Sequence, residues 1–251
     1  MATAREIHRH MKSVGNIGKI TKAMKMVAAA RLRRAQERAA ASRPYAIKIK
    51  EVLSNVVSDP SILANLSAKE HPLLQHREVK KVGYLVLASD KGLAGAYSSN
   101  ALKMAVAEIA ACEDEVVVIT CGRKARDFFQ RRGYNVLESH FGFSDRPSYD
   151  NAQDIAQDAA KRFADEGFDE LRIVYTIFKS ALSQTPTCEK ILPVEPPAKE
   201  AGKAEASFMF EPGENETLSV LAPKYLETVV YAALVQSAAS ELGSRMTAMS
   251  S

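Results

Sequence analysis

Residues 12–36, KSVGNIGKITKAMKMVAAARLRRAQ, belong to a proline-free segment that extends from Ala2 to Arg43. Apolar residues recur in this segment every three or four positions, which places them on one face of a helix: Ile7, Met11, Val14, Ile17, Ile20, Met24 and Val27. The spacing resumes beyond Pro44, which allows a kink near Arg43 because the residue before a proline avoids helical geometry. At about 1.5 Å per residue, the helix to Arg43 alone predicts a rod of roughly 60 Å. A compact domain does not need so long a helix, so we predict a shaft.

A second helical pattern opens at Pro223, a residue suited to a first helical turn, and continues to the last residues. Isolated helices with narrow apolar stripes gain little stability, so we expect the two ends of the chain to pair as an antiparallel coiled coil. With Pro223 at the level of Tyr45, equal rise per residue places Arg245 beside Met24. The shaft before about residue 18 would then lack a partner helix and fray. Two helices lying on one globular core is the alternative, but it leaves the basic face of the first helix without a purpose.

Between these helices the pattern changes to alternating strands and helices. Buried strands are predicted at residues 82–88, 115–121, 134–137 and 171–178, helices at 98–112, 123–132 and 151–165, and two further short strands at 188–192 and 206–210. This β-α-β order predicts a largely parallel sheet with helices on its faces. The predicted fold class is therefore α/β: a long antiparallel coiled coil of the N- and C-terminal helices plus a Rossmann-like α/β domain with a mainly parallel sheet. The expected divisions are residues 1–57, 78–212 and 217–251.

The net charge of +4 is distributed unevenly along the 251 residues. Residues 1–50 contain 13 Lys or Arg against Glu6 and Glu37, which is +11, so the rest of the chain carries −7. So basic a segment predicts an acidic partner, such as nucleic acid, anionic lipid or acidic loops of another protein. The longest uncharged run, residues 228–240, is too short to cross a bilayer. We therefore expect no membrane-spanning segment.

The sequence offers no convincing catalytic, cofactor or metal site. Cys112, Cys121 and Cys188 have no CxxC spacing, and the five histidines form no metal-ligand motif. The stretch GNIGKIT at residues 15–21 ends like a phosphate-binding loop but lacks the GxxxxGK spacing and a preceding strand. SDKGLAG at residues 89–95 follows the first predicted strand, where an α/β sheet places ligands, yet it has GxxG instead of GxGxxG. A Rossmann-like nucleotide-binding protein stays an alternative, as does a nucleic-acid-binding protein with a basic helical arm.

The quoted helix strongly resembles the first helix of the gamma subunit of F-type ATP synthases. Four further segments resemble that family in the same order: SDKGLAGAYSSN (89–100), FGFSDRPSYDNAQDIA (141–156), VYTIFKSALSQTPT (174–187) and APKYLETVVYAALVQSAASELGSRMTAM (222–249). The resemblance covers nearly the whole chain. The resemblance also argues against a transit peptide in the Arg- and Lys-rich N-terminal segment, because the mature helix of the family begins there.

The resemblance implies a non-catalytic rotor in the central stalk, which couples proton translocation to ATP synthesis or hydrolysis on beta subunits. The paired helices would stand inside a ring of three alpha and three beta subunits, and the α/β domain would rest on the membrane c-ring beside the epsilon subunit. The family's contacts with acidic beta-subunit loops are matched by five residues here: Lys22, Met24, Lys25, Arg31 and Arg245. No nucleic acid and no cofactor is implied.

Two departures from the family bear on these expectations. The family's C-terminal helix continues past the position of Ser251, so the chain is expected to be truncated or its function modified. The redox cysteine insertion of chloroplast forms is absent, which favours a bacterial enzyme at the cytoplasmic face of the plasma membrane over an organellar inner membrane or a thylakoid.

Overall fold

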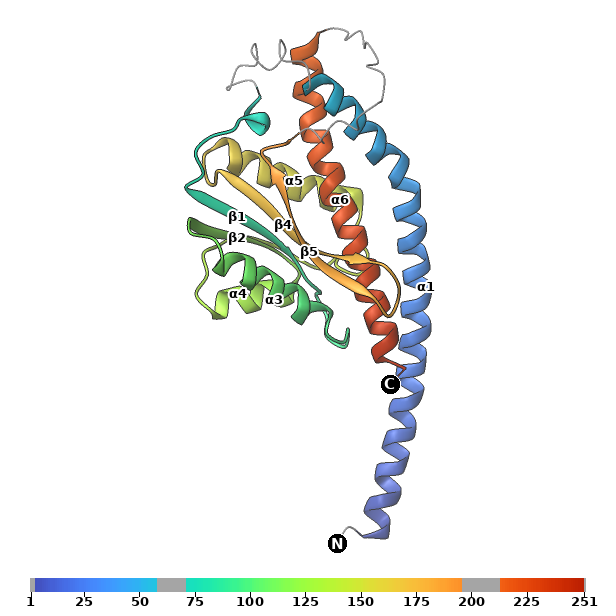
Figure 1. Ribbon diagram of the computed structural model, residues 1–251. Helices are drawn as coiled ribbons and strands as arrows, with labels where there is room; N and C mark the ends of the chain where they lie inside the picture. The colour runs from blue at the N-terminus through green and yellow to red at the C-terminus, as the bar shows by residue number, and fades with distance from the viewer. Residues whose placement is uncertain (1–2, 58–70, 196–212, 251) are drawn as a thin grey trace.

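A computed structural model of the chain describes residues 3–57, 71–195 and 213–250 (Figure 1). Its longest element is α1, Ala4–Val57, whose 54 residues span about 81 Å at 1.5 Å per residue. The helix continues through Pro44 without a break and bends toward the C-terminal helix only near its own end. The predicted shaft is confirmed.

The C-terminal helix α6, Glu214–Ala248, begins well before Pro223, which lies inside it. The predicted start at Pro223 was therefore wrong. Leu218, Ala222 and Leu226 are all buried and lie four residues apart, so core packing holds the turns before the proline in helical geometry. A proline's missing N–H removes one helical hydrogen bond, and the buried apolar surface offsets that loss.

A five-stranded sheet with strand order β3-β2-β1-β4-β5 forms the centre of the α/β domain. Its strands are β1 Lys81–Leu87, β2 Glu115–Cys121, β3 Val136–His140, β4 Glu170–Phe178 and β5 Gln184–Leu192. The first four pair in parallel and β5 pairs antiparallel to β4. This confirms the predicted fold class.

Helices cover both faces of the sheet. The helices are α3 Tyr97–Ala110, α4 Arg123–Arg131 and α5 Tyr149–Ala164, with a short 3-10 turn at Pro72–Leu74. α3 and α4 cover one face, while α5 and α6 cover the other (Figure 1). α6 therefore belongs to the α/β core as well as to the helical pair.

Two strands differ from their predicted bounds by more than one residue. The third strand begins at Val136 because Gly133, with φ of 74°, ends the preceding turn and Tyr134 packs edge-on against Phe129. The fifth begins at Gln184 and includes Pro186, which an edge strand tolerates because its outer side forms no ladder. The strand predicted at residues 206–210 lies outside the described residues.

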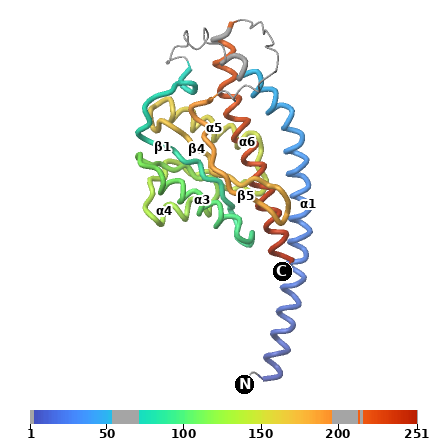
Figure 2. Tube along the Cα trace, viewed as in Figure 1, coloured from blue at the N-terminus to red at the C-terminus, as the bar shows by residue number. Residues whose placement is uncertain are grey.

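The two terminal helices run antiparallel, and α1 extends far beyond the end of α6 (Figure 2). Leu32 and Ala35 pack against Ala239 and Leu242 in a small cluster. From that contact, equal rise places Arg245 near the level of Ala29, so the predicted alignment with Met24 was wrong by about five residues, or roughly 8 Å. The error came from anchoring the register at Pro223.

Within the described residues, one helical segment, Glu216–Ala248, is long and apolar enough to cross a membrane by length and composition. Half of its most apolar window is buried inside the structure. That burial and the buried charged side chains of Glu227, Glu241 and Arg245 fit a core helix.

Candidate interaction site on the shaft and its junction with the domain

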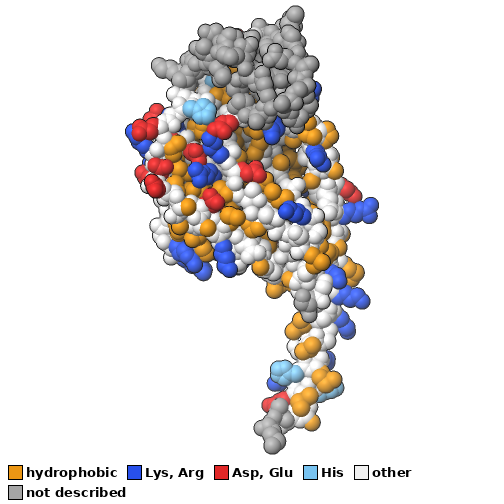
Figure 3. Space-filling view, in the orientation of Figure 1, with side chains coloured by type: hydrophobic (Ala, Val, Ile, Leu, Met, Phe, Trp, Pro, Cys, Tyr) orange, Lys and Arg blue, Asp and Glu red, His pale blue; other side chains and the backbone are white. Residues whose placement is uncertain are grey.

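The free end of α1 is a helix exposed all round. Every residue from 3 to 20 is exposed, including five large apolar side chains: Ile7, Met11, Val14, Ile17 and Ile20. Figure 3 shows apolar and basic side chains on the protruding stem. Cβ atoms added at Gly15 and Gly18 would meet nothing within 4 Å, so no described part of the chain approaches this helix closely. An amphipathic stripe left open in this way is typical of a surface that another protein covers.

Three of the five predicted contact residues lie together just beyond the free end. Lys22 and Lys25 are exposed, and Met24 is half-buried beside the end of α6. No ion pair to either lysine is found among the described residues. The two ammonium groups are therefore available to an acidic partner.

Arg31 lies farther from the free end of α1 and forms its contacts within the chain. Its guanidinium forms an ion pair with Asp145, in the loop between β3 and α5. The Asp145 side chain is 12% exposed, and its carboxylate also forms an ion pair with the Lys91 ammonium group at 3.5 Å. Arg38 donates to the carbonyl oxygen of Pro147 at 3.3 Å. This loop thus ties the shaft to the α/β domain.

Arg245 is placed differently from the prediction. It is only 7% exposed and donates to Glu241 at 2.7 Å and to the Gly92 carbonyl at 3.3 Å. Burial raises the pKa of Glu241 above its usual range, and the charge of Arg245 partly offsets this effect. The structure therefore does not bring Arg245 to the surface beside Met24. The spacing of Glu241 and Arg245, four residues apart on a helix, is the sequence signal that could have indicated this internal pair.

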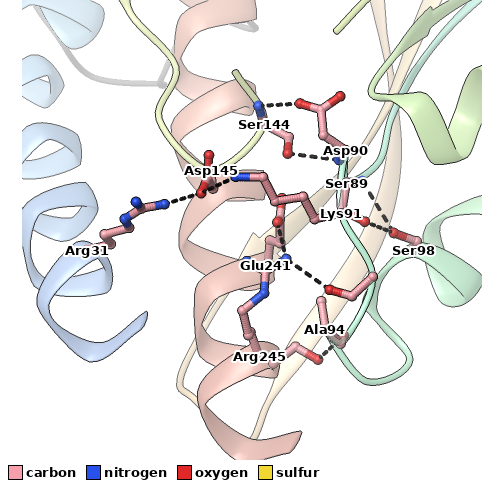
Figure 4. A network of polar contacts seen from close by, with 12 residues as sticks. Arg31, Ser89, Asp90, Lys91, Ala94, Ser98, Ser144, Asp145, Glu241 and Arg245 are labelled. Carbon is pink, nitrogen blue, oxygen red and sulfur yellow. Dashed lines mark hydrogen bonds and ion pairs between the residues drawn. The ribbon is translucent and has the colours of Figure 1, made fainter. Parts of the chain in front are cut away.

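Asp90 organises the junction at the carboxyl end of β1 (Figure 4). Its carboxylate accepts backbone N–H bonds from Arg123 at 3.1 Å, Gly142 at 2.8 Å and Ser144 at 3.0 Å. Its own N–H donates to the Ser144 hydroxyl at 2.9 Å. The Asp90 side chain thus connects the start of α4 to the start of the loop that carries Asp145.

This arrangement weighs against the nucleotide-binding alternative. In Rossmann-like folds the phosphates of the bound nucleotide accept hydrogen bonds from backbone N–H groups at the end of the first strand. Here a carboxylate of the chain itself occupies backbone donors at that edge of the sheet. Leu93 and Gly95 adopt positive φ, and Gly95 packs against Ser244 of α6, so the turn is fitted to its own domain.

Metal-binding side chains do not converge in the described ranges. No group of three or more His, Cys, Asp or Glu side chains there could hold a metal ion. The three cysteines are free, and burial raises the pKa of the Cys121 thiol well above its usual value, which suppresses the reactive thiolate. What the structure presents is a protruding shaft and a braced junction.

Known proteins share this arrangement. The ATP-synt family, described as ATP synthase, matches residues 3–251. The chain is 46% identical over 248 residues to the ATP synthase gamma chain of Brevibacillus brevis, covering 98% of this chain and 84% of the relative. It is 43% identical to that of Desulfitobacterium hafniense, covering 99% of this chain and 85% of the relative. The central stalk and c-ring structure of Tetrahymena thermophila mitochondrial ATP synthase contains a similar chain, with a TM-score of 0.70 and 24% identity over 92% of this chain and 98% of that one.

A long helical pair that protrudes from a five-stranded α/β domain is the fold that this chain shares with the similar chain in that central-stalk structure. The sequence relatives then decide the family. The chain belongs to the ATP synthase gamma chain family. It is accordingly a subunit of the F-type ATP synthase rotor and part of a membrane-bound complex.

Proposed function

We propose that this chain is a non-catalytic shaft that couples proton translocation through the membrane c-ring to ATP synthesis and hydrolysis on the beta subunits. The observation that carries the proposal is the free end of α1, a basic helix with an exposed apolar stripe and no partner in the described chain. An alpha and beta ring around it would cover the stripe and exclude water. The epsilon subunit and the c-ring would hold the α/β domain.

The proposed contact with acidic beta-subunit loops uses Lys22 and Lys25, with Met24 between them. Both lysines project into solvent from the helix just beyond the end of α6. Arg31 would contribute through its ion pair with Asp145, by fixing the angle between shaft and domain. Arg245 would support the junction from inside through Glu241 and Gly92.

The divisions at residues 1–57, 78–212 and 217–251 remain a proposal about how the chain is organised, since α6 packs on the sheet as well as on α1. We further propose that the complex lies at the cytoplasmic face of a bacterial plasma membrane. The sequence relatives at 46% and 43% identity are bacterial proteins, which supports this location.

The test is reconstitution of the chain with alpha, beta and c-ring subunits in vesicles. A Met24→Lys variant adds a third cation between two lysines on the face proposed to meet acidic loops, and should lower the protons pumped per ATP more than it lowers assembly. Met26→Lys is the matched control, because Met26 is 60% exposed and lies on another face of the same turn.

If both variants pump the same number of protons per ATP, the assignment of the Met24 face to the beta-subunit contact is wrong. Failure of the chain to assemble with alpha and beta subunits would remove the proposed function itself. Binding of the isolated chain to duplex DNA, with a steep salt dependence, would instead favour the nucleic-acid alternative.

A further inference from the structure

A small pocket with basic walls lies between the two terminal helices and the loop that carries Asp145. It encloses about 120 Å³. The two helices supply an apolar floor of small side chains: Ala35, Val235 and Ala238. Its basic side chains come from α1 and from the loop between β3 and α5: Arg31, Arg34, Arg38 and Arg146. We call this feature the arginine pocket.

Helical spacing places three of these arginines on one face of α1. Arg31, Arg34 and Arg38 are separated by three and four residues, so their side chains lie over successive turns of the helix. Like charges at this spacing repel one another and destabilise a helix. Leu32 and Ala35, which pack on α6, fix the face of α1 that turns toward the loop. The fold thus holds three guanidinium groups beside a fourth against their mutual repulsion.

The carboxylate in the lining does not neutralise the pocket. Among the described residues that line it, Asp145 alone carries a negative charge, and it forms ion pairs with Arg31 and, at 3.5 Å, with Lys91. Figure 4 shows Arg31 and Lys91 reaching this carboxylate from two different elements. Glu241, on α6, is paired with Arg245 inside the domain. Neither carboxylate is therefore left to balance the other three arginines.

Arg34 and Arg146 are the guanidinium groups most open to a ligand. Both residues are exposed, and neither side chain forms an ion pair or a hydrogen bond in the part of the chain that the structure describes. Arg38 is also exposed and donates to the Pro147 carbonyl oxygen at 3.3 Å, which leaves its charge unbalanced. Four arginines and one aspartate give the lining a net charge of +3. So much unbalanced positive charge around one small cavity favours a bound anion.

The chemistry and the size of the pocket indicate which anion fits. A guanidinium group is planar, and its forked donors match two oxygens of a phosphate group. A cavity of about 120 Å³ has the volume of about four waters at ~30 Å³ each, which suits a single tetrahedral oxyanion. A nucleotide needs a larger site, since pockets for such ligands enclose about 300 Å³ or more.

We propose that the arginine pocket binds inorganic phosphate and thereby braces the junction between shaft and domain. The site is formed within this one chain and does not depend on the rotor function. Its walls come from α1 and from the loop that Asp90 anchors, and α6 contributes to its floor. A ligand that binds the folded arrangement stabilises it in proportion to the logarithm of its concentration. The stability of the junction should therefore rise with the concentration of phosphate.

Calorimetric titration of the full chain with sodium phosphate, at constant ionic strength against chloride, tests the site. One phosphate should bind per chain, and sulfate should compete with it. Arg34→Gln and Arg146→Gln should each weaken binding about tenfold or more, because each removes a charge-assisted hydrogen bond. Arg43→Gln is the matched control, at an exposed arginine of α1 that does not line the pocket, and should bind like the parent. Absence of saturable binding, or equal binding by all three variants, overturns the proposal.

Two further titrations distinguish free phosphate from a larger molecule that carries a phosphate group. ADP should bind no more tightly than phosphate, because the pocket is too small for its nucleoside. A tighter ADP complex that is lost in Arg34→Gln would show a nucleotide site instead. Anionic vesicles that retain the parent chain but not Arg34→Gln would assign the pocket to a lipid headgroup. Either result overturns free phosphate as the ligand.

Phenylglyoxal modification of arginines, mapped by mass spectrometry, locates the ligand in the free chain and in the complex with alpha and beta subunits. Phosphate at ten times its Kd should slow modification of Arg34 and Arg146 about tenfold in both states, and leave Arg43 unchanged. If Arg34 and Arg146 are already unreactive in the complex without phosphate, another subunit covers the pocket, and phosphate is not its occupant. Failure of the chain to assemble would remove the rotor function but would not alter the result for the free chain, so the two proposals can fail separately.

Discussion

Replacing Asp90 by alanine should loosen the junction between shaft and domain. The carboxylate accepts three backbone N–H bonds, from Arg123, Gly142 and Ser144, at 2.8 to 3.1 Å. Hydrogen bonds to a charged group contribute about 1.5 to 3 kcal/mol each when buried. Two of these three lie at exposed positions, where water can replace the acceptor, so we expect a net loss of about 3 kcal/mol. For a chain of this length that corresponds to a fall of ~9 °C in Tm.

Urea unfolding followed by circular dichroism measures the loss, and hydrogen exchange locates it. Asp90→Ala should raise the exchange rate of residues 141–148, because their connection to the end of β1 depends on this carboxylate. Asp90→Asn should give an intermediate loss, since an amide oxygen can accept two of the bonds while its NH2 group opposes the third donor. Asp114→Ala is the matched control, at an exposed position without a hydrogen bond in the described structure, and should change stability by less than about 0.5 kcal/mol.

An Asp90→Ala chain that unfolds at the parent's urea concentration, with unchanged exchange at residues 141–148, would show that the Asp90 carboxylate does not hold the junction. The edge of the sheet would then be held by its apolar packing, and the N–H groups would be satisfied by water. In that case the Asp90 carboxylate would also no longer argue against a phosphate ligand at this edge.

Three further outcomes are expected. Gly122→Ala should lower the free energy of unfolding by more than ~3 kcal/mol, because φ is 100° and the new Cβ would lie 2.1 Å from a backbone oxygen at the end of β1. Gly92→Ala is the control: its new Cβ meets nothing within 4 Å, so the same urea assay should show only a small loss of stability. Amides of residues 4–20 should exchange with solvent much faster in the free chain than those of residues 28–39, and equal protection would reveal a partner for the free shaft. Burial alone would raise the pKa of Asp169, but two backbone N–H donors and an arginine outweigh it and lower that pKa. Asp169→Asn should therefore destabilise the chain at neutral pH. In urea titrations its difference in stability from the parent should disappear as the pH falls below about 3.9, the pKa of Asp in the unfolded chain, and through the lower pKa of Asp169 in the folded chain.

Much of the fold could be predicted from the sequence because its signals are local. The apolar spacing from Ile7 to Val27 requires a helix whatever lies around it, and the run EVVVITC at residues 115–121 matches β2 residue for residue. Strands that alternate with helices predict a parallel sheet, because parallel neighbours need a crossover. These local signals predict the long basic shaft and the α/β domain, and they contain no recognised catalytic motif.

How these elements meet depends on packing between distant parts of the chain. The start of α6 before Pro223 depends on the buried Leu218, and the register of the two helices depends on where Leu32 meets Leu242. The four-residue spacing of Glu241 and Arg245 allows an ion pair on one helix, but that spacing does not show that the pair is buried inside the chain. Burial and partners are properties of surfaces that come together from distant parts of the chain. Periodicity fixes which face of an element is apolar, but the packing of whole elements fixes what that face touches.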